Sequence, residues 1–237
     1  MTEQSSPPSS SDSSSVRLGG HVVGLFDILG QRDILRSWKT PKERNPAVRA
    51  QMVAQLQKTW GVIQSFRGGF RKAFEAFSAT PNLPENTPPE KRELWKSLDN
   101  HPLKLFGFSD TVVAHLAVET SQHKAPTRGV LGLIAATGLM QLHQLSIGYP
   151  IRGGIDLEIA FEIDKDEIYG PALMRAYALE SETAEYPRVV IGDEIMRWLR
   201  GATELNNDDI DKFNQRVAKR TLDDFICADM QSRKSAC

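Results

Sequence analysis

The chain has 237 residues, 40% of them hydrophobic, and 29 Lys and Arg balance 30 Asp and Glu to a net charge of −1. This length suffices for one domain with a substantial core, and the balanced charge gives no general attraction to nucleic acid. Two cysteines, Cys227 and Cys237, make no disulfide framework, which is consistent with a reducing cytosol. Neither a signal peptide nor an apolar membrane span is visible, so we expect a cytoplasmic protein without a membrane partner.

The N-terminal segment is rich in Ser and Pro and poor in apolar residues. Such a composition cannot bury enough surface to offset the entropy lost on ordering. We therefore expect a disordered tail over residues 1–18 and a single catalytic domain over residues 19–237.

Residues 21–30 form an apolar run that ends on a carboxylate, Asp27, and a glycine, Gly30. The run is rich in β-branched, aliphatic and aromatic residues, which predicts a buried strand. Gly30 then lets the chain turn towards a helix. Asp27 is thus expected at a strand end.

A carboxylate at that position can hold a divalent cation while neighbouring backbone amides face phosphate. The amides in question are those of Leu29, Gly30 and Gln31. The alternative is that Asp27 only caps the helix that follows, which Asp does readily.

A second stretch, Leu103 to Val118, contains two apolar, β-rich runs joined across residues 107–110. This pattern predicts a hairpin with Asp110 at its tip. Because Asp is common in turns for local reasons, a plain turn residue is the alternative.

The remaining chain alternates helical and strand patterns. Apolar steps of three and four residues predict a long helix over 46–77, kinked or broken at Gly68 and Gly69, and a helix over 129–145 whose leucines are deeply buried. Further expected elements are short helices at 33–38 and 91–98, strands at 150–163 and 188–191 with a turn at 164–166, a helix from Tyr169-Gly170-Pro171 to about 184, and a last strand at 225–228. This order predicts an α+β sandwich with a mostly antiparallel sheet.

These stretches resemble the class III nucleotidyl cyclase superfamily over about residues 20–195. Its first strand carries F-x-D-I-x-G-F, and here the run is Leu25-Phe26-Asp27-Ile28-Leu29-Gly30, with Gln31 where an aromatic is usual. Its central hairpin carries a second metal-binding Asp, which here corresponds to Gly107-Phe108-Ser109-Asp110. The chain is similar in particular to the pyrimidine cyclases of Pycsar anti-phage defence, in Phe-Ser-Asp, Arg152-Gly153-Gly154-Ile155, Tyr169-Gly170-Pro171-Ala172, Arg175-Ala176-Tyr177 and Leu179-Glu180.

The resemblance implies a βαββαβ core with helices packed on one side of the sheet, and puts Asp27 and Asp110 at adjacent strand ends. Two such carboxylates repel each other unless cations lie between them. The implied cofactors are two divalent cations, Mn²⁺ or Mg²⁺, held by both carboxylates and the backbone carbonyl of Ile28. Nucleotide contacts are expected from Phe26, Leu29, Gly30, Gln31 and Arg152.

The implied reaction is cyclisation of UTP to 3′,5′-cyclic UMP and pyrophosphate in a homodimer with active sites across its interface. The product would act on a separate cyclic-nucleotide-binding effector. The alternatives are a cytidylate cyclase, a purine cyclase and an inactive nucleotide-binding module.

This chain lacks the two residues with which class III cyclases stabilise the transition state. Met174 and Ala178 stand where class III enzymes have Asn and Arg, so Arg175 is the candidate catalytic substitute. A surface salt bridge from Arg175 to Glu182 or Asp166 is the alternative. The purine-selecting Lys would fall near Phe106, which argues against the usual purine contact.

Overall fold

The computed structural model describes residues 17–31, 46–79, 87–90, 92–93, 102–118, 127–163 and 167–227. Its centre is a sheet whose longest path has the strand order β2-β3-β1-β4-β5, with β6 paired to β4. The first described elements follow the order strand, helix, strand, strand, helix, strand.

The strands lie close to the predicted positions. They are β1 (Arg17–Ile28), β2 (Lys104–Phe108), β3 (Thr111–Ala117), β4 (Ile151–Ile163), β5 (Glu167–Tyr169) and β6 (Val189–Ile191). Every pairing is antiparallel except that of β4 with β6. The prediction of a mixed α+β fold with a mostly antiparallel sheet is therefore confirmed.

Alternation along β1 divides the core into two clusters, because successive side chains of a strand point to opposite faces. Val22, Phe26 and Ile28 face the larger cluster, and Val23 and Leu25 face the smaller one. Asp27 lies two residues after Leu25 and four after Val23, so its side chain points to the same face as theirs, the face of the smaller cluster.

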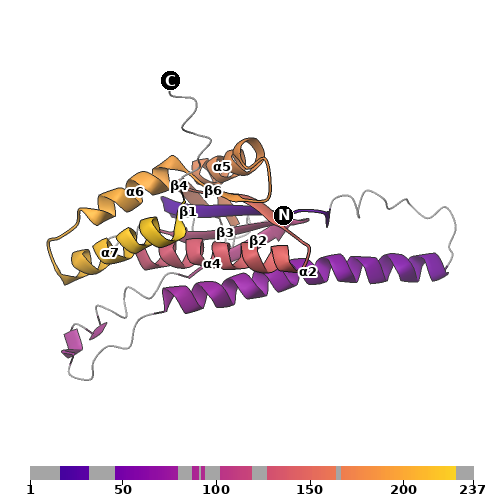
Figure 1. Cartoon of the computed structure of the whole chain (residues 1–237), viewed down its shortest axis with the longest axis horizontal. Coiled ribbons are helices and arrows are strands. Elements are labelled where there is room, and N and C mark those ends of the chain that lie inside the picture. The colour runs from indigo at the N-terminus through magenta and orange to yellow at the C-terminus, as the bar shows by residue number, and fades with distance from the viewer. Residues whose placement is uncertain are drawn as a thin grey trace, which may run out of the picture.

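Helices cover both faces of the sheet, so the expectation of helices on one side is wrong. The larger cluster receives apolar side chains from α2 (Pro46–Ser78), α4 (Thr127–Ser146), α6 (Asp193–Thr203) and α7 (Asp209–Arg220). The smaller cluster receives them from α5 (Pro171–Ala178). In Figure 1, α5 lies above the sheet and α2 and α4 lie below it. The long strand β4 contributes apolar residues to both clusters, Ile151 and Ile155 to the larger and Ala160 to the smaller. Each face of the sheet therefore needs helices to cover it.

The helix α5 continues directly into a π-helical segment, η1 (Leu179–Thr183). Together they account for the helix predicted up to about residue 184. A second π-helical segment, η2 (Thr221–Phe225), follows α7. The predicted strand at 225–228 is wrong for its described part, because Phe225 ends η2, and Ile226 and Cys227 lie in no strand.

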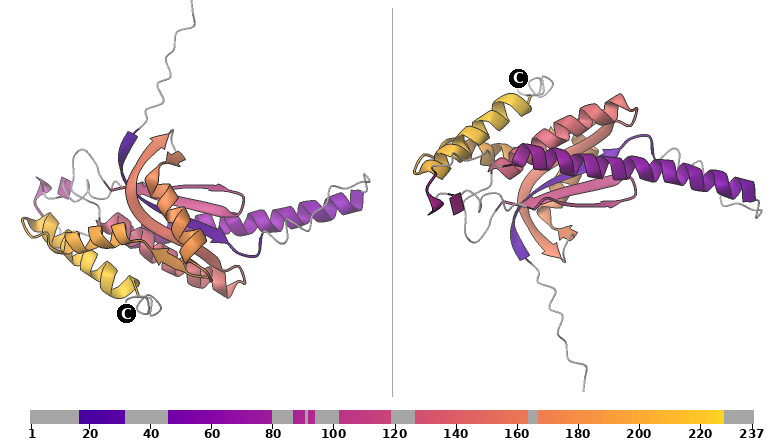
Figure 2. Two further views of the ribbon diagram at one scale, coloured as in Figure 1. Left: turned by 90° about the horizontal axis from the view of Figure 1, so that it is seen from above. Right: turned by 90° about the horizontal axis from the view of Figure 1, so that it is seen from below.

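The helix α2 is continuous, so the predicted break at Gly68 and Gly69 is wrong, and a kink there stays a prediction. Gly69 lies against the thioether of Met140 in α4, so a small residue there allows the two helices to approach closely. The N-terminal half of α2 projects beyond the sheet in both views of Figure 2.

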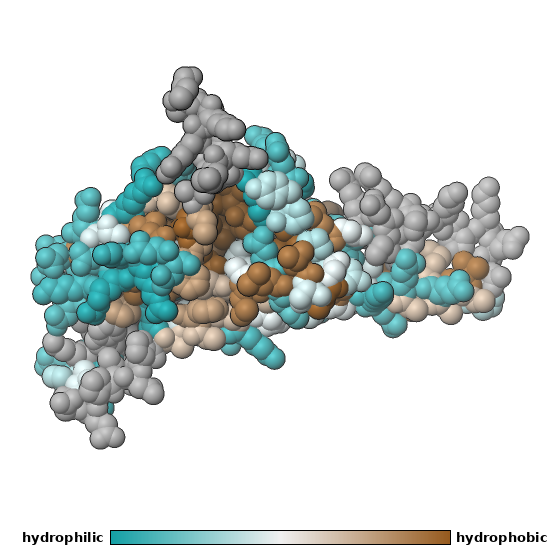
Figure 3. Space-filling view, in the orientation of Figure 1, coloured by the Kyte–Doolittle hydropathy of each residue, from teal (hydrophilic) through white to brown (hydrophobic). Residues whose placement is uncertain are grey.

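The predicted deep burial of the α4 leucines is also wrong at its C-terminal end. Leu139, Leu142 and Leu145 are 48%, 69% and 59% exposed, whereas Leu133 and Ile134 are buried. The face seen in Figure 3 has hydrophobic surface near its middle, beside a hydrophilic region on the left. Because α4 is apolar nearly all round, its hydrophobic pattern has little periodicity and does not predict which side faces solvent.

Some expectations fall outside the described residues or at their border. The strand β1 begins at Arg17, two residues inside the segment expected to be a tail, and residues 1–16 lie outside the described ranges. The expected helix at 33–38, most of that at 91–98 and the turn at 164–166 also lie outside them. No helix among the described residues is both long and apolar enough to cross a membrane.

We predict that Gly68→Ala stabilises the protein by about 0.5–1 kcal/mol, because alanine favours a continuous helix and nothing lies within 4 Å of its added Cβ. Urea unfolding followed by circular dichroism measures the change. The matched control is Gly69→Ala, whose Cβ would lie 3.0 Å from Met140 and should give a smaller gain. Destabilisation by Gly68→Ala would contradict this expectation and favour a kink at this position.

Candidate active site

The register of β1 and β3 brings the two predicted carboxylate residues to the same end of the sheet. Asp27 pairs with Thr111, the residue after Asp110. The backbone N–H of Ile28 donates to the carbonyl oxygen of Asp110 at 3.2 Å. The turn between β2 and β3 consists of Ser109, at a φ of 57°, and Asp110. Asp27, Ile28 and Asp110 are therefore neighbours along this edge.

The arginine opposite Asp27 in the sheet connects it to a buried glutamate. Arg152 pairs with Asp27 across β1 and β4. Its Nε donates to Glu180 Oε1 at 2.7 Å, and its Nη2 lies 2.6 Å from the same oxygen. The same Nη2 lies 3.8 Å from Asp27 Oδ2. Arg152 thus stands between two carboxylates and is held much more closely by Glu180.

The segment that carries Glu180 touches the sheet at Gly154. A Cβ at this position would overlap the backbone oxygen of Ala176 and the side chain of Leu179. Only glycine lets α5 and η1 approach β4 this closely. Arg152, Gly154 and Asp156 share one face of β4 because residues two apart in a strand point the same way.

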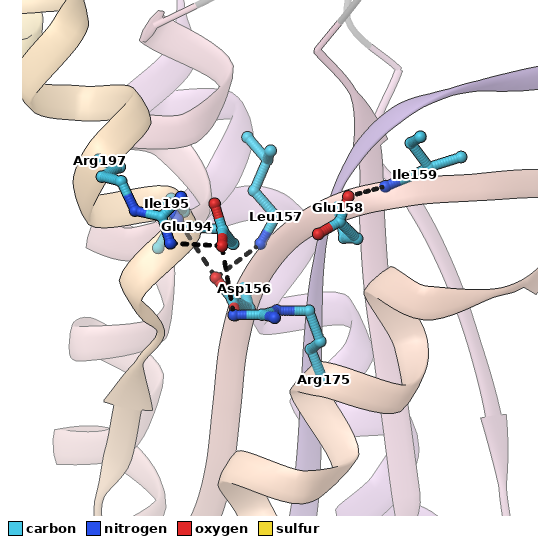
Figure 4. A network of polar contacts seen from close by, with 8 residues as sticks. All are labelled: Asp156, Leu157, Glu158, Ile159, Arg175, Glu194, Ile195 and Arg197. Atoms are coloured by element: carbon cyan, nitrogen blue, oxygen red, sulfur yellow. Dashed lines mark hydrogen bonds and ion pairs between the residues drawn. The ribbon is translucent and has the colours of Figure 1, made fainter.

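Asp156 holds the other end of the same helical segment through Arg175, as Figure 4 shows. Arg175 Nε donates to Asp156 Oδ2 at 2.7 Å, and its Nη2 lies 3.8 Å from Glu194. Asp156 is only 1% exposed, and its Oδ1 accepts from the backbone N–H groups of Leu157 and Ile195. A single buried carboxylate therefore joins β4, α5 and the first turn of α6.

This network answers the alternative considered for Arg175. The observed partners are Asp156 and Glu194. A bridge to Glu182 is therefore wrong, and Asp166 lies outside the described residues. The hydrogen bond to Asp156 raises the pKa of Arg175 above its ordinary value; burial lowers it, and the charges of Asp156, Glu194 and Glu158 raise it further. Arg175 is 39% exposed in its side chain and remains cationic.

The predicted nucleotide contacts differ in whether their groups already have partners within the protein. The ring of Phe26 is fully buried between Phe66 and Phe70, with ring centroids 5.9 and 5.3 Å away. The amide of Leu29 donates to the carbonyl of Pro150 at 2.9 Å. The Phe26 ring is therefore part of the core, and the Leu29 amide extends the pairing of β1 to the chain before β4 instead of facing phosphate.

Gly30 lies exposed in the turn after β1, whereas the neighbouring Gln31 is buried. Gly30 adopts a φ of +86° and is exposed, with nothing within 4 Å of a hypothetical Cβ. Gln31 is 1% exposed, and neither side-chain amide atom has a hydrogen-bond partner among the described residues. An unsatisfied buried amide costs roughly 1–3 kcal/mol, so this position suits a polar ligand.

The donor set at this edge fits hard divalent cations. Carboxylate and carbonyl oxygens are the ligands that Mg²⁺ and Mn²⁺ prefer. Asp27, Ile28 and Asp110 supply two carboxylates and one carbonyl. No group of three or more His, Cys, Asp or Glu that could hold a metal occurs among the described residues, and the present set has only two such side chains.

Sequence reasoning missed the two carboxylates that hold the arginines, Asp156 and Glu180. Their partners are 19 and 28 residues away in the chain. The available signal was the two-residue spacing of Arg152, Gly154 and Asp156 on a predicted strand. That spacing puts two opposite charges on either side of a glycine, which is typical of a face that receives another element.

No protein-family model matches this chain, and no curated protein matches it either. Among solved structures it is similar to the crystal structure of the adenylyl cyclase CyaB from P. aeruginosa. The identity is 13%, the TM-score is 0.49, and the match covers 79% of this chain and 83% of that one. A likeness of this degree does not carry that protein's class or activity over to this chain.

We predict that Asp156→Asn destabilises the protein by about 1–3 kcal/mol, because it removes a buried charge that accepts several hydrogen bonds. Chemical unfolding measures the loss. The matched control is Glu158→Gln, on the same face of β4, whose carboxylate accepts one exposed hydrogen bond from Ile159. It should change stability by less than about 0.5 kcal/mol. Equal effects of both substitutions would contradict the joining role of Asp156.

Proposed function

We propose that this protein is a nucleotidyl cyclase that converts UTP to 3′,5′-cyclic UMP and pyrophosphate with two divalent cations. One observation carries the proposal: Asp27, Ile28 and Asp110 are neighbours at one end of the sheet. They occur in the order and spacing of the class III cyclase motifs that the sequence resembles. The βαββαβ core of that superfamily is part of the proposal.

The residues at this edge have separate tasks in the proposed reaction. Asp27, Asp110 and the Ile28 carbonyl hold the cations. When bound, these would lower the pKa of the ribose 3′-hydroxyl and neutralise the triphosphate. The 3′-oxygen, its proton lost to water, would then attack the α-phosphorus in line; the bond to the β-phosphate oxygen would break and pyrophosphate would leave, so the protein needs no nucleophile of its own.

Arginines supply charge for the phosphates because their planar fork binds phosphate oxygens bidentately. Arg152 lies beside Asp27 and is proposed to contact the nucleotide of its own subunit. Arg175 belongs to a different part of the face, where its Nε is fixed by Asp156. We propose that it contacts the substrate of a second copy, so that the enzyme is a homodimer with active sites at the interface.

A pyrimidine base is supported by Phe106 at the position of the purine-selecting lysine. Phe106 packs on the smaller core cluster, and its ring centroid lies 6.0 Å from that of His115. An apolar side chain there offers no donor to a purine edge. The buried amide of Gln31 is a candidate partner for nucleotide polar groups. The alternatives are CTP or a purine triphosphate as substrate, and an inactive nucleotide-binding module, which Met174 and Ala178 favour.

The proposed biological role is synthesis of a second messenger in bacterial anti-phage defence. The cyclic nucleotide would act on a separate effector that binds it. The motifs that support this role are those shared with the Pycsar pyrimidine cyclases.

We expect a single cyclic UMP peak when purified protein is incubated with each of the four ribonucleoside triphosphates and Mn²⁺, followed by chromatography and mass spectrometry. Cyclic CMP, AMP or GMP as the main product would favour the corresponding alternative. Absence of product from all four triphosphates would favour the binding module.

We expect Asp27→Ala and Asp110→Ala each to reduce metal-dependent turnover by about 100-fold or more, because each removes a cation ligand. Neither side chain belongs to the apolar clusters, so the unfolding midpoint should hardly change. Glu185→Ala, at an exposed position, is the control and should keep its activity. Unchanged turnover in either Asp variant would rule out the two-metal proposal.

A further inference from the structure

We infer that Phe108 is the stacking platform for the nucleobase, so that a bound nucleotide lies with its base on this ring. The inference rests on the proposed function for the class of its ligand, a nucleotide. It adds a contact to the base, which the proposed cation ligands do not make. The ring alone makes this contact, and no cation takes part in it.

The exposure of Phe108 is the first observation. Its side chain is 85% exposed, the highest value of any large apolar residue in the described part of the chain. A phenyl ring left in water forgoes the burial that normally stabilises such a side chain. Phe106, two residues earlier on the same strand, packs on the smaller core cluster instead. Packing within the fold thus gives no reason for an aromatic residue at position 108.

The strand register places Phe108 in one row with the proposed site. It pairs with Thr111, which pairs with Asp27. Asp27 in turn pairs with Arg152. Residues directly opposite each other on paired strands share a face, so this row lies on the face of the smaller cluster. Neighbouring strands are about 4.8 Å apart, so the row is roughly 14 Å long, and an extended nucleoside triphosphate has a comparable length.

The turn beside Phe108 fixes the position of the ring. Two residues, Ser109 and Asp110, join β2 to β3. Ser109 has a φ of 57° and is the one non-glycine residue with a positive φ among the described residues. A two-residue hairpin turn with a positive φ at its first position alone normally has glycine there. Backbone strain of this kind persists where the surrounding structure determines it, and it is concentrated at functional sites.

Helix α2 closes the reverse side of the same hairpin. A Cβ at Gly107 would lie 2.7 Å from the backbone oxygen of Thr111 and 3.2 Å from Nη2 of Arg67 in α2. Arg67 thus lies on the face opposite to that of Phe108, because successive residues of a strand point to opposite faces. The ring is therefore held on the face of the smaller cluster before any ligand arrives, and binding needs little further ordering.

An aromatic ring can hold a nucleobase without selecting it. Aromatic side chains on sheets stack the bases of single-stranded nucleic acids, and every base has a π-face for such a contact. Stacking on Phe108 holds the base at one end of the row, while Arg152 lies at the other end for the phosphates. Phe108 therefore supplies affinity for the base, and other groups choose among bases.

The surroundings of Phe108 favour a nucleobase over a protein partner. The neighbouring residues in the chain, Gly107, Ser109 and Asp110, are small or polar. The core of a protein interface is instead apolar and poor in charged residues. A second copy of the chain on this ring is accordingly the alternative that the experiment must separate.

Isothermal titration calorimetry of the full chain with Mn²⁺ tests the contact, with α,β-methylene-UTP and inorganic triphosphate as the two ligands. The methylene group replaces the leaving oxygen, so the analogue cannot be cyclised. We expect Phe108→Ala to raise the Kd of the analogue by about fivefold or more, because loss of one aromatic stacking contact has an effect of this order. The Kd of inorganic triphosphate, which has no base, should stay within about twofold.

Two further variants separate stacking from apolar contact. Phe108→Tyr keeps the ring and should bind the analogue within about twofold of the unaltered protein. Phe108→Leu keeps an apolar side chain without a π-face and should lose as much affinity as Phe108→Ala. Leu142→Ala is the control, since Leu142 is an apolar side chain of α4 that is 69% exposed, and it should change neither Kd. Full affinity in Phe108→Leu, or equal loss for both ligands in Phe108→Ala, overturns the inference.

Sedimentation velocity separates base stacking from docking of a second copy. Unchanged sedimentation of Phe108→Ala, together with its weaker binding of the analogue, supports the inference. If the unaltered chain is a dimer and Phe108→Ala dissociates it, the ring is a subunit contact and the inference is overturned.

The outcomes also separate this inference from the proposed function. If the unaltered chain forms no cyclic product, yet Phe108→Ala weakens binding of the analogue alone, the proposed reaction fails and the stacking contact stands. If cyclic UMP is formed and Phe108→Ala binds the analogue normally, the reaction stands and the inference is overturned. If the unaltered chain binds the analogue no more tightly than inorganic triphosphate, the base has no contact and the inference is overturned whatever the activity.

Discussion

The close contact of α5 and η1 with β4 at Gly154 is the constraint on which the rest of the site depends. Glycine alone leaves room for the backbone of Ala176 against the strand. An ion pair stands on each side of this contact, Arg152 with Glu180 and Arg175 with Asp156. The two pairs have opposite polarity, since the strand supplies the cation of one and the anion of the other. The helical segment therefore fits β4 in one register only.

Local patterns were sufficient to predict most elements of the fold. The hairpin around Asp110, the strand that ends near Asp27 and the helices α2 and α4 each follow from residues adjacent in the chain. The predictions that failed concerned features that depend on residues far away in the chain. A break at Gly68 and Gly69 was wrong because a long helix tolerates glycine where another helix packs closely. Hydrophobicity alone could not predict that the C-terminal leucines of α4 are exposed or that helices cover both faces of the sheet. It does not specify which face of an element packs against which layer.

The candidate site shows the same division. Asp27 and Asp110 could be proposed from sequence because a strand end and a hairpin tip are local features. Asp156 and Glu180 could not, because their partners lie on other elements. The amide of Leu29 was expected to face phosphate, yet Pro150 accepts from it, since the hydrogen bonding of β1 to the chain before β4 continues through Leu29.

The two buried carboxylates give the arginines different freedom, and this difference bears on the chemistry they can perform. Asp156 is fixed by two backbone N–H groups and binds Arg175 through Nε, so the terminal nitrogens of Arg175 point towards Glu194 and the more exposed surface. Glu180 binds Arg152 through both Nε and Nη2, which directs the remaining donor capacity towards Asp27. A site that must gather a polyphosphate needs cationic groups in fixed places before the ligand arrives, because reorganising them on binding costs free energy. Buried carboxylates do this better than solvent-exposed ones because their own positions do not fluctuate. The sheet face beside Asp27 is thus arranged so that its positive charges are held by acids other than the proposed cation ligands.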